Sequence, residues 1–150
     1  MRDDWEEQDE ETPFAPAPDA RRESNDAASD DASEAVAEPT TVYANVDEFV
    51  RGFVIEGLSR PIDGQQRVWA AEWWKYPEAI SRLDAMWRSW EHMRLDGATG
   101  LSAWYINHAD PHMRVLMDPH GPFAGAKVYA DENKNRAGEP LPYTRPPDMW

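Results

Sequence analysis

The sequence predicts a mostly α-helical protein: a small bundle of three to four short helices with a disordered acidic N-terminal arm and an extended, proline-rich C-terminus. Two observations lead to this prediction. Apolar residues recur at helical spacing between residues 46 and 117. Residues 1–40 hold 14 Asp and Glu against three Arg, and such a segment buries too little apolar surface to offset its ordering entropy. We therefore expect an arm over residues 1–42, a tryptophan-rich domain over 43–126 and a C-terminal segment over 127–150.

The first helix is expected over residues 46–58. Asn45 suits the N-cap position, and Glu48 stands three residues later, as in a capping box. The segment Arg-Pro-Ile-Asp-Gly over 60–64 then ends the helix and turns the chain. Six apolar side chains follow the cap at helical spacing: Val46, Phe49, Val50, Phe53, Val54 and Leu58.

The second helix is expected from Pro77 to Leu95, because proline suits a first helical turn and Asp96-Gly97 suits a stop. Acidic and basic side chains four residues apart should pair on its surface; these are Glu78–Arg82 and Asp84–Arg88. Seven apolar side chains share one sector of the helix: Ala79, Ile80, Leu83, Met86, Trp87, Trp90 and Met93.

Arg94 interrupts that apolar sector near the end of the second helix. A guanidinium in such a place needs a carboxylate, a carbonyl oxygen or an aromatic face. The favoured interpretation is a structural ion pair or a side chain that extends to solvent. The alternative is a contact with an anion or another ligand.

A third helix is expected over Leu101–His108, followed by a fourth with Asp110 as N-cap and Pro111 in its first turn. The segment over 118–123 then forms a turn. Residues 128–130 are either a short strand or an extended piece. Four prolines after residue 139 predict an extended, polyproline-like C-terminus, and Trp150 either packs back on the domain or binds elsewhere.

Composition narrows the possible functions. The formal net charge of −14 falls mainly on the arm, so it describes the arm rather than the domain. The chain has no cysteine, which excludes disulfides, thiol catalysis and cysteine-ligated zinc. No apolar run approaches the roughly 20 residues of a membrane span, and the acidic start does not resemble a secretory signal. We expect a cytoplasmic protein without membrane association.

His108, Asp110 and His112 form the one cluster that suggests a metal site, with Asp118 and His120 nearby. Two histidines four residues apart on one helix can share a zinc ion. Pro111 is expected to break the helix between them, so that the two rings need not share a face. We therefore expect capping aspartates and hydrogen-bonded histidines, with no metal and no cofactor. A metal-dependent hydrolase at this cluster is one alternative function.

The tryptophans divide into expected core residues and candidate contact residues. Trp87, Trp90 and Trp104 are expected in the core. Because Trp73 and Trp74 are adjacent, they should not point the same way, and an exposed tryptophan can be an interaction hot spot. The candidate partner-binding residues are therefore Trp69, Trp73, Trp74, Arg94 and Trp150.

The segment from Trp73 to Phe123 resembles the actinobacterial family called domain of unknown function 4913. The resemblance covers about residues 43–125 and implies an actinobacterial host and, often, a phage, plasmid or integrated element. It implies no activity. The matching residues are Trp73, Trp74, Pro77, Glu78, Ala79, Trp87, Trp90, Trp104, His108, Asp110, Pro111, His112, Gly121, Pro122 and Phe123.

The leading functional hypothesis is a non-enzymatic accessory or adaptor protein that binds another protein. The sequence lacks a phosphate loop and a nucleophile motif. A nucleic-acid-associated protein that uses arginine and exposed tryptophan is the other alternative, although acidic residues interleave with the basic ones and the acidic arm would repel DNA. The sequence leaves the oligomeric state open.

Overall fold

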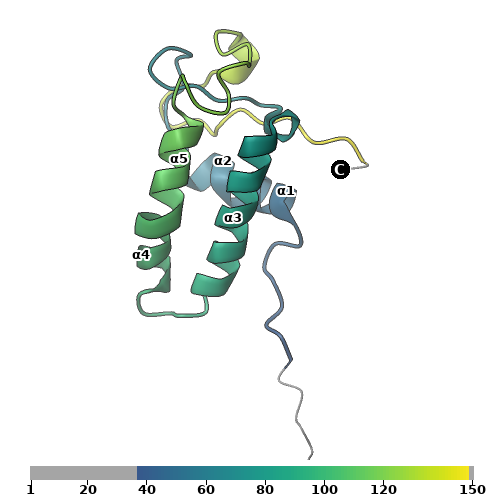
Figure 1. Cartoon of the computed structure of the whole chain (residues 1–150), viewed down its shortest axis with the longest axis vertical. Coiled ribbons are helices and arrows are strands. Elements are labelled where there is room, and N and C mark those ends of the chain that lie inside the picture. Colours follow the sequence, from purple (N-terminus) through teal and green to yellow (C-terminus); the bar gives the residue numbers. More distant parts are fainter. Residues whose placement is uncertain (1–36, 149–150) are drawn as a thin grey trace, which may run out of the picture. The chain divides into compact units, whose positions relative to one another are not determined.

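The computed structural model describes residues 37–148, and Figure 1 shows that this part of the chain is helical, as predicted. Of these, residues 38–148 belong to one compact unit. Most of the expected disordered arm, residues 1–36, lies outside the described residues, as does Trp150.

The first predicted helix is confirmed, as a continuous run of α1 (Val46–Phe49), a π-helical segment (Val50–Val54) and α2 (Ile55–Gly57). Its cap is a variant of the expected capping box. The Asn45 side chain accepts a hydrogen bond from the Glu48 N–H at 2.9 Å, and the Glu48 carboxylate accepts one from the Ala44 N–H at 2.9 Å. The start of the helix is therefore fixed by its own side chains.

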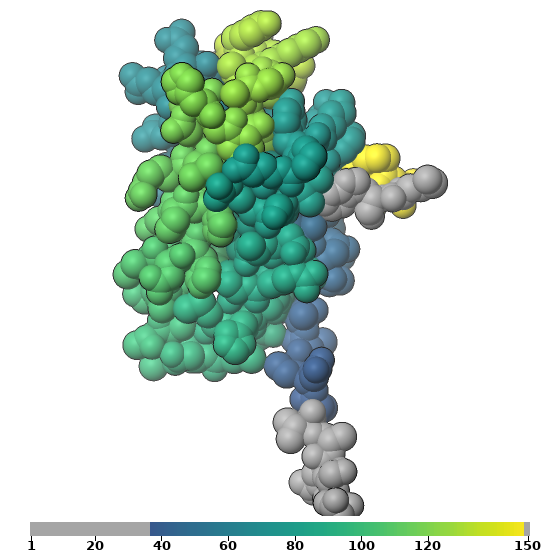
Figure 2. Space-filling view, in the orientation of Figure 1, coloured from purple at the N-terminus to yellow at the C-terminus, as the bar shows by residue number. Residues whose placement is uncertain are grey.

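Helix α3 (Pro77–Met93) follows a short 3-10 turn (Trp73–Lys75) and contacts α1, α4 and α5. Both predicted ion pairs on its surface are present. Arg82 Nε lies 2.9 Å from Glu78 and Arg88 Nε lies 2.7 Å from Asp84. Figure 2 shows the surfaces of α3 (teal) and of the α4–α5 helix (green) meeting along their length.

The expected break between a third and a fourth helix is wrong. Helix α4 (Gly100–Trp104), a π-helical turn (Tyr105–Ala109) and α5 (Asp110–Leu116) form one continuous helix. Asp110 has helical dihedral angles and its N–H donates to the Tyr105 carbonyl, so it is not an N-cap. A proline inside a helix lacks an N–H and crowds the carbonyl four residues earlier. The wider π turn just before Pro111 relieves that crowding.

Residues 117–148 form turns, one 3-10 turn (Asp131–Asn133) and an extended final segment. The strand considered near Val128 is not formed; within residues 37–148, β pairing is limited to one antiparallel bridge between Ile62 and Asn135. The final segment crosses the helical part, with the Leu141 N–H bonded to the Ile55 carbonyl at 2.8 Å and the Thr144 N–H to the Ala71 carbonyl at 2.9 Å. The C-terminal segment therefore packs with the helices, and no boundary appears at residue 126.

Large aromatic rings fill the core. Trp104 is fully buried, and its indole N–H lies 3.1 Å from both the Met86 carbonyl and the Ser89 hydroxyl. This confirms the expectation for Trp104. Trp87 and Trp90 are only half-buried and pack against the edge of the core. The other aromatic residues without accessible surface in the described part of the chain are Phe49, Trp69, Trp73 and Phe123.

Trp104→Ala should lower the free energy of unfolding by about 3–5 kcal/mol, because it opens a cavity and removes the contacts of a buried ring. Urea unfolding of the full chain measures this. The control is Leu101→Ala on the same helix, where the side chain is 47% exposed and the cost should stay below about 1 kcal/mol. Equal costs for the two variants would contradict the packing described here.

Candidate functional site

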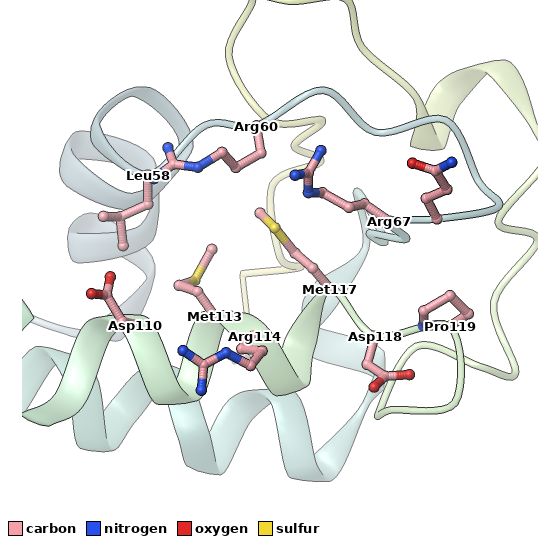
Figure 3. Close-up of a pocket in the computed structure, with 10 residues that line it drawn as sticks. Leu58, Arg60, Arg67, Asp110, Met113, Arg114, Met117, Asp118 and Pro119 are labelled. Atoms are coloured by element: carbon pink, nitrogen blue, oxygen red, sulfur yellow. The ribbon is translucent and has the colours of Figure 1, made fainter. Parts of the chain in front are cut away.

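A pocket of about 410 Å³ opens between the loop after α2 and one face of α5 (Figure 3). Three arginines, two aspartates and two methionines are among its lining residues. The full lining is Leu58, Arg60, Gln66, Arg67, Asp110, Met113, Arg114, Met117, Asp118 and Pro119.

One helix face supplies four of the lining side chains. Asp110, Met113, Arg114 and Met117 stand at positions i, i+3, i+4 and i+7, which share one side of an α-helix. All four belong to α5 (Asp110–Leu116) or to its C-cap, Met117. Met113, Met117 and Leu58 are 8%, 7% and 5% exposed, so the floor of the pocket is apolar and well packed.

The opposite wall is a loop held in shape by Asp63. The Asp63 carboxylate accepts hydrogen bonds from the backbone N–H groups of Gln65, Gln66 and Arg67 at 2.9, 2.8 and 3.1 Å. These bonds, led by the one from Gln65, hold the pKa of Asp63 below its ordinary value. Gly64 has a φ of +76°, and a Cβ there would collide with the Val128 carbonyl oxygen. The loop that carries Arg67 is therefore preformed.

A backbone bond joins the two walls. The Val68 N–H donates to the Met117 carbonyl at 3.0 Å. This bond fixes the loop beside the C-terminal end of α5. Figure 3 shows Arg60 and Arg67 extending from the loop above Met113 and Met117, with Asp110 and Arg114 on the helix below.

The charges in the pocket are incompletely neutralised. Within residues 37–148, none of Arg60, Arg67 and Arg114 forms an ion pair, and Arg60 makes one side-chain hydrogen bond, to the Ser59 carbonyl at 2.8 Å. All three residues are exposed. Asp118 accepts a hydrogen bond from the His120 N–H at 2.8 Å. The arginines therefore keep most of their donors available for an incoming acceptor.

Two of the candidate partner-binding tryptophans belong to the core instead. Trp69 and Trp73 have no accessible surface, so proposing them as contact residues was wrong. The Trp69 indole N–H donates to the Pro142 carbonyl at 2.9 Å, and its ring packs edge-on against Phe123. The C-terminal segment and the turn at Phe123 therefore cover the indole ring of Trp69, which its neighbours in the sequence do not bury.

Trp74 is half-buried, and its indole N–H donates to the Thr144 carbonyl at 3.1 Å. Lys75 Nζ stands 5.4 Å from the centre of the Trp74 ring. Trp74 therefore helps to hold the C-terminal segment.

Arg94 takes part in a structural ion pair, the favoured interpretation. Its Nε lies 2.7 Å from Glu91, and one terminal nitrogen donates to the Thr40 carbonyl at 2.7 Å. The Glu91 carboxylate also accepts the backbone N–H groups of Val42 and Tyr43 at 3.1 and 2.8 Å. The pair therefore ties residues 40–43 to the end of α3.

The pKa of Glu91 reflects these contacts. Burial by itself raises the pKa of the carboxyl, but the hydrogen bonds from Tyr43, Arg94 and Val42 outweigh it and leave the pKa below its ordinary value of 4.5. The carboxylate is thus charged at neutral pH and holds its three partners.

His108 and His112 interact electrostatically, but the histidine cluster does not form a set of metal ligands. His112 Nδ1 lies 3.1 Å from an Arg82 nitrogen, and burial, then the charges of Arg82 and His108, hold the pKa of His112 below its ordinary value. A cation at this position repels a metal ion. Asp110 lines the arginine pocket instead. Among residues 37–148, no three His, Asp or Glu side chains are grouped to hold a metal.

Arg60, Arg67 and Arg114 are not among the site residues predicted from the sequence. The available signal is the helical spacing of Asp110, Met113, Arg114 and Met117, which lies within the predicted fourth helix. The fold brings Arg60 and Arg67 to the same place through a loop whose path depends on the distant contact with Val128.

A family model described as Domain of unknown function (DUF4913) matches residues 43–147. The chain belongs to the DUF4913 family. The match extends beyond the expected limit of residue 125, and it contains the whole pocket and the crossing C-terminal segment. No curated protein and no solved structure matches the chain. In the described part of this DUF4913 protein, no helix has the length and apolarity needed to cross a membrane.

Glu91→Gln should destabilise the protein at pH 7 by about 1–2 kcal/mol, because a buried carboxylate loses its charge-assisted hydrogen bonds. The folded pKa is lowered, so the contribution of Glu91 is present at neutral pH and is lost as the pH falls below about 4.5. Urea unfolding at pH 7 and at acid pH measures this difference. Glu78→Gln, in an exposed pair, is the control and should cost less than about 0.5 kcal/mol. A Glu91→Gln cost that does not change with pH would contradict this account.

Proposed function

We propose that this DUF4913 protein is a non-enzymatic adaptor that binds a partner protein through the arginine–methionine pocket. One observation carries the proposal: Arg60, Arg67 and Arg114 surround a buried apolar floor, and none of them is paired within the described chain. The lining carries three guanidiniums against two carboxylates, and an incoming negatively charged group would offset the remaining positive charge.

The composition of the pocket supports a protein partner. Arginine and methionine are enriched in protein interfaces, and arginine is frequent among the residues that dominate binding energy. Methionine is unbranched and adapts its shape to the side chain placed against it. The walls are held by backbone bonds, so a partner would meet a site that needs little reordering.

The wider setting belongs to the same proposal. The family resemblance favours an accessory role in an actinobacterial mobile element, such as a phage, a plasmid or an integrated element, with the protein in the cytoplasm. An adaptor needs no catalytic group, and the pocket residues offer ionic and apolar contacts rather than a nucleophile with its base.

A photo-crosslinking amino acid placed at Gln66 of the full chain tests the proposal. Gln66 is exposed and lines the pocket, whereas the neighbouring Gln65 is exposed and does not line it. We expect one discrete host protein to be crosslinked from position 66 and not from position 65. The captured protein, once identified and purified, should bind the unmodified chain in titrations and bind Arg114→Glu at least about tenfold more weakly.

Equal capture from both positions would count against the proposal, as would a purified partner that binds Arg114→Glu as tightly as the natural chain. Recovery of nucleic acid instead of protein at position 66 would replace it with the nucleic-acid alternative.

A further inference from the structure

We infer that the pocket recognises an acidic peptide segment with one apolar side chain, presented by the partner protein. This inference rests on the proposed function and names the chemistry of its ligand. Carboxylates of the segment would pair with Arg60, Arg67 and Arg114. The apolar side chain would lie against Met113 and Met117.

The charge arrangement favours carboxylates. Guanidinium groups bind carboxylates through two parallel hydrogen bonds, and Arg67 and Arg114 have no side-chain hydrogen bond within residues 37–148. Arg60 and Arg67 extend from the loop, while Arg114 comes from the helix (Figure 3). Positive groups therefore stand on both walls, and an acidic segment between them would meet a cation on each side.

The floor favours one apolar anchor. Leu58, Met113 and Met117 present little exposed surface, but together they form the base of the pocket. A volume of about 410 Å³ lies in the lower part of the range of ligand-binding cavities, roughly 300–1,000 Å³. It has room for one side chain and adjoining backbone rather than for a folded element.

The aspartates distinguish a peptide from a nucleic acid. Asp110 and Asp118 would repel a phosphate backbone, which has no donor to offer them, whereas a peptide backbone can donate its N–H groups. No aromatic ring lines the pocket, so bases have nothing to stack on.

Fluorescence anisotropy with the full chain tests the inference. The probe is a labelled short peptide in which Asp and Glu flank one central leucine. One comparison peptide carries Asn and Gln in place of the acids, and another carries serine in place of leucine. We expect saturable binding of the first peptide that weakens as salt rises, and binding at least about tenfold weaker for each comparison peptide.

Arg67→Gln and Arg114→Gln should each weaken binding of the acidic peptide by roughly fivefold to tenfold. Arg136→Gln is the matched control, because Arg136 is exposed and lies outside the pocket. Its binding should equal that of the natural chain. Urea unfolding midpoints of the three variants should agree with that of the natural chain, which separates lost binding from lost folding.

The inference is overturned if the acidic peptide does not bind, if Arg136→Gln weakens binding as much as the pocket variants, or if an oligonucleotide binds the pocket more tightly than the peptide. If the acidic peptide does not bind but a partner is captured at Gln66, the inference is rejected and the proposed function is retained. If the peptide binds but no partner is captured, the chemistry inferred for the ligand is retained and the proposed function is rejected.

Discussion

The candidate site depends on α5 being one helix with α4, and the π-helical turn before Pro111 makes that continuity possible. A proline in the middle of a helix removes one hydrogen bond and crowds the preceding turn. Here the Asp110 N–H donates to the Tyr105 carbonyl, and α4 continues into α5. Asp110, Met113, Arg114 and Met117 stand on one face of α5 and its C-cap, and the continuous helix joins that face to the α4 segment that contacts α3. A helix that ended before Pro111 would separate the helical wall of the pocket from that α4 segment.

Hydrogen bonds and one ion pair between residues far apart in the sequence then hold the two ends of the small domain to its helical part. The indole N–H groups of Trp69 and Trp74 bond carbonyls of the C-terminal segment, while Glu91 and Arg94 hold residues 40–43 against α3. Both ends of the compact unit are thus fixed to the helices through side chains of the helical part. The family match from 43 to 147 covers almost the same stretch, so it includes the C-terminal segment.

The helices were predictable because their signals are local. Caps, helical spacing and i,i+4 charge pairs located α1–α2 and α3 within a few residues. The errors came from residues whose environment is set by distant parts of the chain. Trp69 is one example: the Pro142 carbonyl that its indole N–H bonds lies 73 positions away in the sequence. Pro111 predicts a helix start, because proline suits the first turn of a helix. Here it lies inside a continuous helix, where the preceding π turn accommodates it. The arginine pocket was not predictable, because Arg60 and Arg67 reach the face of α5 from a loop that tertiary contacts hold in place.

The most direct test of this account follows the methionine methyl groups by NMR while an acidic, leucine-containing peptide is titrated into the full chain. Met113 and Met117 form the pocket floor, Met86 is fully buried in the core, and Met93 lines a different cavity. The account predicts saturable shifts of the Met113 and Met117 methyl signals while those of Met86 and Met93 stay in place. Shifts confined to Met93, or no saturable shift at Met113 and Met117, would contradict it.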